Sequence, residues 1–519
     1  MRKKAIMTDA KLWKILNLSL IIMAIFYRVI PYQSMLPTWD ELGTIVEIHY
    51  SYPKLWSYLL EGKHPPIYFF SIKFLSTFFT INYYLIKIPS SLACLVLIYI
   101  FYNFALKELG NYISYVVTFL FGLSYPVFLF GFEGRPYIFI MLFSFLGFIF
   151  YNDLLKKTIR ENIPSNWIIC LKLYVIGMVC LYTSYLSGLL FCCFTFIFLL
   201  IMLKHWGLKI IKSQIKIFFT IFAITISYLP WFLLTKKKIA QHFWEHPQGS
   251  TNYLYYLKSF FNHSDVMLFV FIISVLISIF CLFYPKKMPW RKDFSFLFAG
   301  YSLFLFLIIL RSIFFSSLIS FRYTALLTPF FYIIIGLGLK YIFNTKKGSL
   351  LSLLFFIPLM YLNPFYPSEG GYYQSHFIDF NKVFNRIEQL SIENKIPSQL
   401  EKTDTFLFFS NPDFMYYPVM QNKFARQLQY HPMNMPPRLH YGGLCQEIGE
   451  YSQMAKHINY INQKRYEGIL IIRGYNECSY AAYLHSELEK FAILKFTESN
   501  ISFNISIEYW QLISNSSKD

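Results

Sequence analysis

Apolar residues along the chain gather in long runs that short polar segments separate. Runs of spanning length lie at about 13–31, 84–106, 112–130, 136–155, 166–183, 185–204, 213–234, 264–284, 294–313, 322–343 and 348–363. Because about 20 apolar residues cross the hydrocarbon core of a bilayer, these runs predict about eleven transmembrane helices. The pattern is that of a mainly α-helical polytopic membrane protein.

The apolar run Pro66–Phe79 is shorter and contains Lys73, so it predicts an interfacial helix within a first outer loop at 32–83. With the N-terminus inside and this helix on the outer surface, most basic loops fall on the cytoplasmic side, as the positive-inside rule requires. Lys236–Lys238 is the basic run that this topology leaves outside. The cytoplasmic basic residues are Lys156, Lys157, Arg160, Lys204, Lys209, Lys212, Lys216, Lys286, Lys287, Arg291, Lys292, Lys346 and Lys347.

The segment after about residue 363 is the one long polar part of the chain. Buried strands are predicted at 403–410 and 468–473, and alternation near 491–513 predicts a hairpin. Helical patterns lie at 376–395 and 448–465. We therefore expect a transmembrane module at 1–363 and a C-terminal extracytoplasmic α/β domain at 364–519.

Composition supports a membrane protein. The chain is 56% hydrophobic and 14% charged, whereas soluble domains carry about 25% charged residues. The net charge of +19 lies largely in short loops, so membrane topology explains it without a nucleic-acid partner. The apolar run at 15–30 lacks a cleavage site and predicts a retained signal anchor. Whether Cys445 and Cys478 in the tail form a disulfide stays open.

Carboxylates are scarce in the chain yet cluster directly after the first apolar run. A polar loop that caps a helix is the commoner explanation of an Asp at this place, and the alternative is a general base at the membrane surface that removes a proton from a hydroxyl. The stretch at 37–68 holds the candidates Asp40, Glu41, Glu61, Lys63 and His64.

Three cations lie at the predicted outer ends of spans. Arg135 stands in FEGRPY, Arg322 in SFRYTALLTP and Lys87 in IKIPSS. An Arg at such a position is commonly an interfacial anchor, but two that face one carboxylate cluster can bind a phosphate through bidentate hydrogen bonds. An ion pair between Arg135 and the nearby Glu133 explains Arg135 equally. Tyr137 and Tyr323, which accompany the arginines, complete the candidate phosphate site.

A zinc protease is disfavoured. The segment 242–246 matches H-x-x-E-H, but Pro247 follows at once and interrupts the helix that such a site needs. The outer loop at 235–263 is better interpreted as a substrate-facing or membrane-surface segment. No cofactor is required by any motif, although the carboxylates permit a divalent metal.

The ordered set of motifs resembles the GT-C glycosyltransferases. It comprises the acidic pair after the first span, a Pro-Pro segment, Lys87-Ile-Pro-Ser, Arg135-Pro-Tyr and Arg322-Tyr with a following proline. The likeness is to the branch (family 39) with the protein O-mannosyltransferases and the lipid A aminoarabinose transferases, over about residues 10–363. Lys87 departs from that pattern, in which arginine is common.

The resemblance implies a hexosyl- or pentosyltransferase of a bacterial cytoplasmic membrane. The donor would be a sugar on polyprenyl phosphate, and the acceptor a hydroxyl of a glycan, a lipid such as lipid A or a protein. Asp40 would be the general base of an inverting attack, and Glu41 or Glu61 would orient the acceptor. A transporter or flippase, or a non-catalytic membrane scaffold, shares the composition. Charges at span ends and the absence of a clear repeat disfavour a transporter.

Overall fold

The computed structural model describes residues 39–61, 65–79, 83–160, 166–206, 214–242, 257–258, 260–261, 264–283, 291–314, 321–342, 386, 389–390, 392–393, 395, 405–409, 468–473, 489, 492–502 and 505–512. Its helices are α2 (Trp39–His49), α3 (Tyr52–Glu61), α4 (Ile67–Leu75), α5 (Tyr83–Leu109), α6 (Asn111–Gly122), α7 (Tyr125–Phe132), α8 (Tyr137–Arg160), α9 (Trp167–Thr183), α10 (Tyr185–Trp206), α12 (Ile215–His242), α14 (Asp265–Phe283), α15 (Arg291–Phe314), α16 (Phe321–Thr324), the 3₁₀ helix η3 (Ala325–Leu327) and α17 (Thr328–Ile342). The strands are β1 (Thr405–Phe409), β2 (Gly468–Arg473), β3 (Ala492–Ser502) and β4 (Ile505–Leu512).

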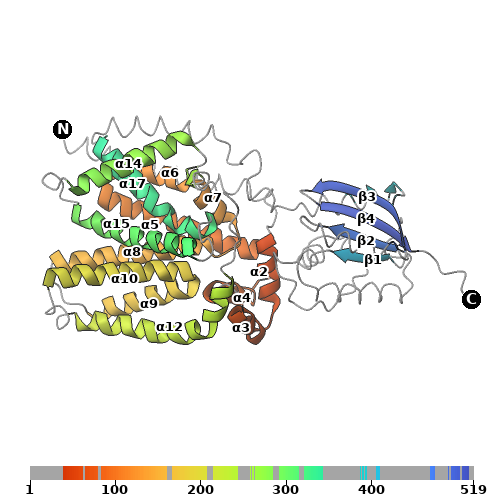
Figure 1. The fold of residues 1–519 in the computed structure, drawn as a ribbon, viewed down its shortest axis with the longest axis horizontal. Coiled ribbons are helices and arrows are strands. Elements are labelled where there is room, and N and C mark those ends of the chain that lie inside the picture. The colour runs from red at the N-terminus through yellow and green to blue at the C-terminus, as the bar shows by residue number, and fades with distance from the viewer. Residues whose placement is uncertain are drawn as a thin grey trace, which may run out of the picture. The chain divides into compact units, whose positions relative to one another are not determined.

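The chain divides into two compact units (Figure 1). The first holds Glu47–Pro367, and the second holds Ser368–Asp519 together with Met35–Val46. The first unit is a bundle of apolar helices and the second is built around a sheet. The predicted runs at 13–31 and 348–363, the helical pattern at 448–465, Cys445 and Cys478 lie outside the described residues.

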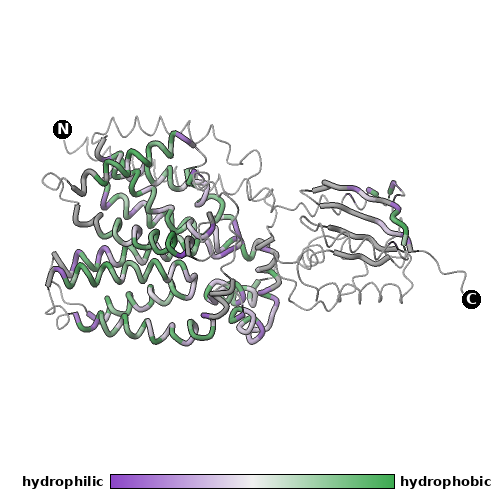
Figure 2. Tube along the Cα trace, viewed as in Figure 1, coloured by the Kyte–Doolittle hydropathy of each residue, from purple (hydrophilic) through white to green (hydrophobic). Residues whose placement is uncertain are grey.

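The long helices of the first unit are apolar over most of their length (Figure 2). Within the described ranges, five segments are long and apolar enough to cross a membrane: Leu85–Leu109, Tyr137–Thr158, Tyr185–Lys204, Ile215–Lys236 and Arg322–Lys340. Shorter apolar helices lie at Trp167–Thr183, Asp265–Ile277 and Phe296–Ser312. Each run predicted between residues 84 and 343 falls on a described helix, and the polytopic membrane fold is confirmed.

One predicted span is wrong in its shape. The run at 112–130 is not a single helix but the pair α6 and α7, bent by 51°. Ser124 is extended, with ψ at 143°, and Pro126 lies in the first turn of α7. Because proline lacks a backbone N–H and its ring clashes with the preceding turn, the helix restarts there instead of continuing.

Three helices run in the same direction and share two ends. At their far end Lys107 binds Asp153 at 2.7 Å, Lys156 binds Glu108 at 2.5 Å, and Lys340 donates to the Glu108 carbonyl at 2.9 Å. These contacts join the last turns of α5, α8 and α17, and we call this place the paired end. Between the ends α5 and α8 pack through aromatic rings, such as Phe101 and Phe145, whose centroids lie 5.6 Å apart.

The second unit contains a four-stranded sheet of order β1-β2-β4-β3. β1 is parallel to β2, while β4 is antiparallel to both β2 and β3. The strands lie where hydrophobic runs and alternation predicted them, including the hairpin. Buried Trp510 on β4 and Ala492 on β3 contribute to its core.

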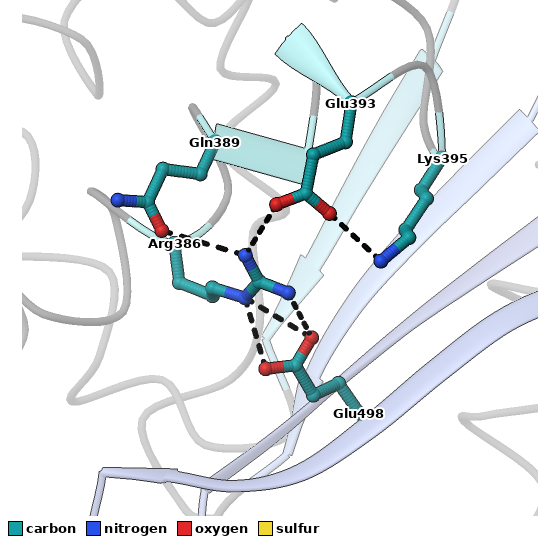
Figure 3. A network of polar contacts seen from close by, with 5 residues as sticks. All are labelled: Arg386, Gln389, Glu393, Lys395 and Glu498. Carbon is teal, nitrogen blue, oxygen red and sulfur yellow. Dashed lines mark hydrogen bonds and ion pairs between the residues drawn. The ribbon is translucent and has the colours of Figure 1, made fainter.

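An ion-pair network ties the residues around 386–395 to this sheet. Arg386 donates to both carboxylate oxygens of Glu498 on β3, at 2.8–3.1 Å, and to Glu393 at 2.9 Å (Figure 3). Lys395 also pairs with Glu393, at 2.7 Å. Arg386, Gln389, Leu390 and Ile392 are helical, within the helix predicted at 376–395.

Candidate active site

The predicted catalytic carboxylates begin helix α2. Asp40 and Glu41 lie in its first turn, and Glu41 is fully buried. Thr44, Ile45 and Ile48 are buried as well. Spacings of three, four and seven residues put these four side chains on one face, so α2 is amphipathic and begins with a buried acid. The side chain of Asp40 lies outside the described residues.

Helix α4 is the predicted interfacial helix. Pro66 is its N-cap, and its nine residues rise only about 13 Å, too little to cross a bilayer. Lys73 of α4 donates to the Ile48 carbonyl at 2.7 Å. A cation at this carbonyl stabilises α2, because the C-terminal end of a helix dipole is negative. Glu61, one of the predicted site residues, ends α3 with an exposed side chain, and Lys63 and His64 lie outside the described residues.

Arg135 lies in a tight turn between α7 and α8. Its N–H donates to the Glu133 carbonyl at 2.8 Å. A Cβ added to Gly134 would stand 2.7 Å from Cγ1 of Ile86 on α5, so only glycine lets the turn approach this closely. Glu133 and Arg135 are only 3% and 7% exposed. The turn therefore fixes a buried acid and a buried base against the start of α5.

Lys87 lies level with this turn. Two contacts align α5 with α7: the Ser91 hydroxyl donates to the Gly131 carbonyl at 3.0 Å, and the Cys94 thiol contacts the Val127 carbonyl at 3.5 Å. Lys87 precedes Ser91 by four residues and so lies on the same face of α5, one turn nearer to the turn at 133–135. Lys87 is 2% exposed.

Arg322 and Tyr137 are in direct contact. The Arg322 guanidinium carbon lies 5.9 Å from the Tyr137 ring centroid, within the range of a cation–π interaction. The Tyr137 ring also lies 5.0 Å from Phe130. Because Tyr137 follows Arg135 by two residues, the start of α8 brings both arginines into one region. Tyr323, next to Arg322, is half-buried.

The predicted cations thus gather where α5, α8 and α16 begin. We call this place, with Lys87, Arg135, Tyr137 and Arg322, the site end. The start of a helix is electropositive because its first N–H groups point outward. The starts of α5 and α8, two arginines and a lysine can together bind an anion beside the buried Glu133, and the planar guanidinium groups suit a phosphate.

Glu47 and Tyr58 belong to the same region, although the sequence did not single them out as site residues. Glu47 on α2 is 8% exposed. Burial raises the pKa of Tyr58 well above its usual range, and the adjacent Glu47 carboxylate, which accepts a hydrogen bond from the phenol, raises it further. The charge of Arg135 acts in the opposite direction on the same pKa. Glu47 belongs to the carboxylate cluster at 37–68 but was given no role, whereas Tyr58 is one of 42 tyrosines and carries no such signal.

A metal centre has no support in the described part of the chain. No three His, Cys, Asp or Glu side chains among the described residues lie close enough together to hold an ion. The H-x-x-E-H segment begins at His242, the last residue of α12, and its remaining residues lie outside the described ranges.

Solved structures share the fold. The protein is similar to ArnT from Cupriavidus metallidurans in the apo state, with a TM-score of 0.53, 12% identity, and coverage of 97% of this chain and 98% of that chain. It is also similar to ArnT from the same organism bound to undecaprenyl phosphate, with a TM-score of 0.51, 11% identity, and coverage of 86% and 88%. No protein-family model matches the chain, and no curated protein matches its sequence. The likeness shows a GT-C-like polytopic membrane fold, as the order of motifs predicted.

Proposed function

We propose that the protein is a membrane glycosyltransferase that moves a hexosyl or pentosyl group from a polyprenyl-phosphate donor to an acceptor hydroxyl. The gathering of Lys87, Arg135 and Arg322 at the site end carries this proposal. These cations suit the phosphate of such a donor. The fold is shared with a protein whose structure contains undecaprenyl phosphate, which supports the same class of lipid here.

The positions of charged residues at the two ends of the bundle support a location of the reaction on the outer face of the membrane. Lys87 and Glu108 on α5 are separated by about 30 Å of helix rise, which is close to the thickness of the hydrocarbon core. Lys156 and Lys340 lie at the paired end. By the positive-inside rule the paired end faces the cytoplasm. The site end then lies on the outer face of a bacterial cytoplasmic membrane. The α/β domain is proposed to be extracytoplasmic for a separate reason, because an odd number of predicted spans follows an N-terminus inside.

The proposed mechanism uses one base and several cations. Asp40 removes the proton from the acceptor hydroxyl, and the oxygen attacks the anomeric carbon from the face opposite the phosphate. The bond between the anomeric carbon and the phosphate oxygen breaks, and polyprenyl phosphate leaves with the electron pair. The configuration of the sugar is inverted. Negative charge grows on the departing phosphate, so cations fixed beside it lower the barrier.

The other predicted residues take supporting roles. Glu41 or Glu61 orients the acceptor or tunes Asp40, while Lys63 and His64 add positive charge near the phosphate. Tyr137 holds Arg322 through its ring, and Tyr323 contacts the donor. Helix α2 is continuous from Trp39 to His49, so position 40 lies two turns before position 47 on the same helical face.

The test is donor consumption by the purified protein in nanodiscs. Undecaprenyl-phosphate-linked sugars are offered with three classes of acceptor, namely lipid A, an oligosaccharide and a peptide with serine and threonine, and released undecaprenyl phosphate is measured. We expect release with one acceptor class, and a loss of at least about a hundredfold in Asp40→Asn because a general base contributes about 10²–10⁴-fold.

Two outcomes would count against the proposal in different ways. Full activity in Asp40→Asn means that the base is wrongly assigned while the transferase reaction stands. If the wild-type protein consumes no donor and binds undecaprenyl phosphate no better than undecaprenol, the glycosyltransferase proposal itself is wrong.

A further inference from the structure

Lys73 on α4 holds the C-terminal end of α2. Its ammonium group donates a hydrogen bond to the carbonyl of Ile48 at 2.7 Å, and Ile48, the residue before the last of α2, is fully buried. The last carbonyls of a helix have no partner within the helix, and the helix dipole favours a cation beside them. The end of α2 is therefore fixed to α4 at a defined point (Figure 1).

A second set of contacts keeps the Lys73 side chain in place. Its ammonium group lies 5.8 Å from the centroid of the Tyr52 ring, within the range of a cation–π interaction. The Tyr52 ring stacks on the ring of Phe70, with centroids 5.8 Å apart and planes inclined by 13°. Because Phe70 and Lys73 are three residues apart on α4, their side chains are neighbours on its surface. The Lys73 ammonium group is thus held between the end of α2 and the start of α3.

The buried side of α4 contacts the start of α8. Tyr68 is buried, and its ring lies 5.6 Å from the ring of Phe139 in the first turn of α8. Phe139 follows Tyr137 by two residues and Arg135 by four. Helix α4 therefore joins the end of α2, through Lys73, to the helix start that carries the site end, through Tyr68.

The length of α2 converts a small movement at its end into a large one at its start. Asp40 precedes Ile48 by eight residues, which is about 12 Å of helix rise. A tilt of about 5° at the anchored end then moves position 40 by about 1 Å. A catalytic group displaced by about 1 Å can lose about a hundredfold in rate. The contact that holds the end of α2 can therefore control a base near its start.

We propose that Lys73 is a positioning residue that fixes the direction of α2 and, through that helix, the place of Asp40. Lys73 acts through the backbone carbonyl of Ile48 and does not touch the donor. This inference rests on the proposed function, because it takes Asp40 as the general base. It adds a residue that sets kcat, while the cations of the site end set the affinity for the donor phosphate.

The experiment compares the full-length protein in nanodiscs with the variant Lys73→Met, which keeps the aliphatic stem and removes the ammonium group. Hydrogen exchange of peptides that cover 39–49 should rise about fivefold, as for the loss of one hydrogen bond. The kcat for release of undecaprenyl phosphate from the sugar donor should fall between about tenfold and a hundredfold. The affinity for undecaprenyl phosphate itself should stay unchanged, because the ammonium group binds a backbone carbonyl and not the phosphate.

Three further variants separate a positioning role from a structural one. Lys73→Arg keeps a charged donor and should restore both kcat and the slow exchange of α2. Lys54→Met is the matched control, because it removes an exposed cation of α3 that lies 4.2 Å from the Tyr50 ring centroid, and it should change neither quantity. Thermal unfolding checks the fold of each variant. If Lys73→Met does not fold, Tyr52→Leu removes the exposed ring beside the ammonium group and should lower kcat in the same direction.

Three results would overturn the inference. One is wild-type kcat in folded Lys73→Met, or in Tyr52→Leu where Lys73→Met does not fold. Another is unchanged exchange of α2. The third is a loss of affinity for undecaprenyl phosphate as large as the loss of kcat, which would mean that Lys73 serves donor binding.

The same assays keep the inference apart from the proposed function. A wild type that consumes the donor, and that loses this activity in Asp40→Asn, leaves the proposed function standing whatever Lys73→Met does. Full activity in Asp40→Asn overturns the inference, because Lys73 is proposed to act through that base. A wild type that consumes no donor rejects the proposed function, and the inference with it.

Discussion

The two ends of the helical unit treat charge in different ways. At the paired end, acids and bases of α5 and α8 form ion pairs, Lys107 with Asp153 and Lys156 with Glu108, and Lys340 of α17 donates to the Glu108 carbonyl. At the site end, Lys87 and Arg135 are almost fully buried at neighbouring helix starts, and Arg322 lies over an aromatic ring. The same helices carry both sets of residues, about 30 Å apart.

The difference between the two ends indicates which of them binds a ligand. A pair that joins two helix ends is explained by its own partner and needs no ligand. Burial of a charge is costly, and the site end gathers three cations beside the buried carboxylate Glu133. We interpret the site end as built for an anion and the paired end as built to hold the helices together.

The largest effect should come from removing a guanidinium at the site end. Arg135→Gln is expected to lower the affinity for undecaprenyl phosphate between about tenfold and a hundredfold, because a charged hydrogen-bond donor to the phosphate is lost. Equilibrium binding in nanodiscs measures it. The matched variant at the paired end, Lys107→Gln, removes an exposed cation and should change the affinity less than about twofold. If both variants lost the same affinity for undecaprenyl phosphate, the proposed difference between the two ends would be wrong.

Loss of a carboxylate at the paired end should act on stability instead. Glu108→Gln leaves Lys156, whose side chain is 17% exposed, without its ion-pair partner. We expect a cost of about 1–3 kcal/mol in the free energy of unfolding, seen as a lower Tm in detergent. The affinity of the folded protein for undecaprenyl phosphate should be preserved. A clear loss of affinity at unchanged Tm would show that the paired end also serves binding.

The ring beneath Arg322 should matter less than the guanidinium of Arg135. Tyr137→Leu removes the cation–π contact and is expected to weaken phosphate binding about fivefold. Tyr137→Phe keeps a π face and should bind nearly as the wild type does. If both variants lose affinity equally, the phenol hydroxyl is what matters, and Tyr137 does not act through its ring.

The exposed network of the second unit should have the smallest effect. Hydrogen bonds from Lys395 and then Arg386 lower the pKa of Glu393 below its ordinary value of 4.5. The sign follows from linkage: the contribution to stability is present above the ordinary pKa and is lost as the pH falls through the lowered one. Hydrogen exchange of the segment 386–395 in the full-length protein, corrected for intrinsic rates, should rise as the pH falls below about 4.5. In Glu393→Gln this pH dependence should shrink, and an unchanged profile would exclude Glu393 as its source.

Much of the fold could be predicted from the pattern of hydrophobic residues alone. Long apolar runs and strand alternation depend on local residues, so α5, α8 and the β3–β4 hairpin lie where they were expected. The bend between α6 and α7 was missed because the apolar pattern continues through it. Pro126 was the available signal.

The candidate site was predictable only where charge stands out in an apolar chain. Arg135, Arg322 and Lys87 were visible for that reason. Tyr58 was not, since the influence of Glu47 on its pKa depends on how α3 packs against α2 and not on sequence spacing. Nor did the sequence distinguish exposed Glu61 from buried Glu41, because burial depends on how helices pack.

The most direct test of the central claim is to find which end of the bundle binds the phosphate. A polyprenyl phosphate analogue with a photoreactive diazirine beside the phosphate is bound to the protein in nanodiscs, cross-linked, and mapped by peptide mass spectrometry. The account predicts cross-links in the peptides that contain 133–137 and 321–324, displaced by undecaprenyl phosphate but not by undecaprenol. Cross-links at 107–111 and 153–156, or spread evenly over the apolar helices, would contradict it.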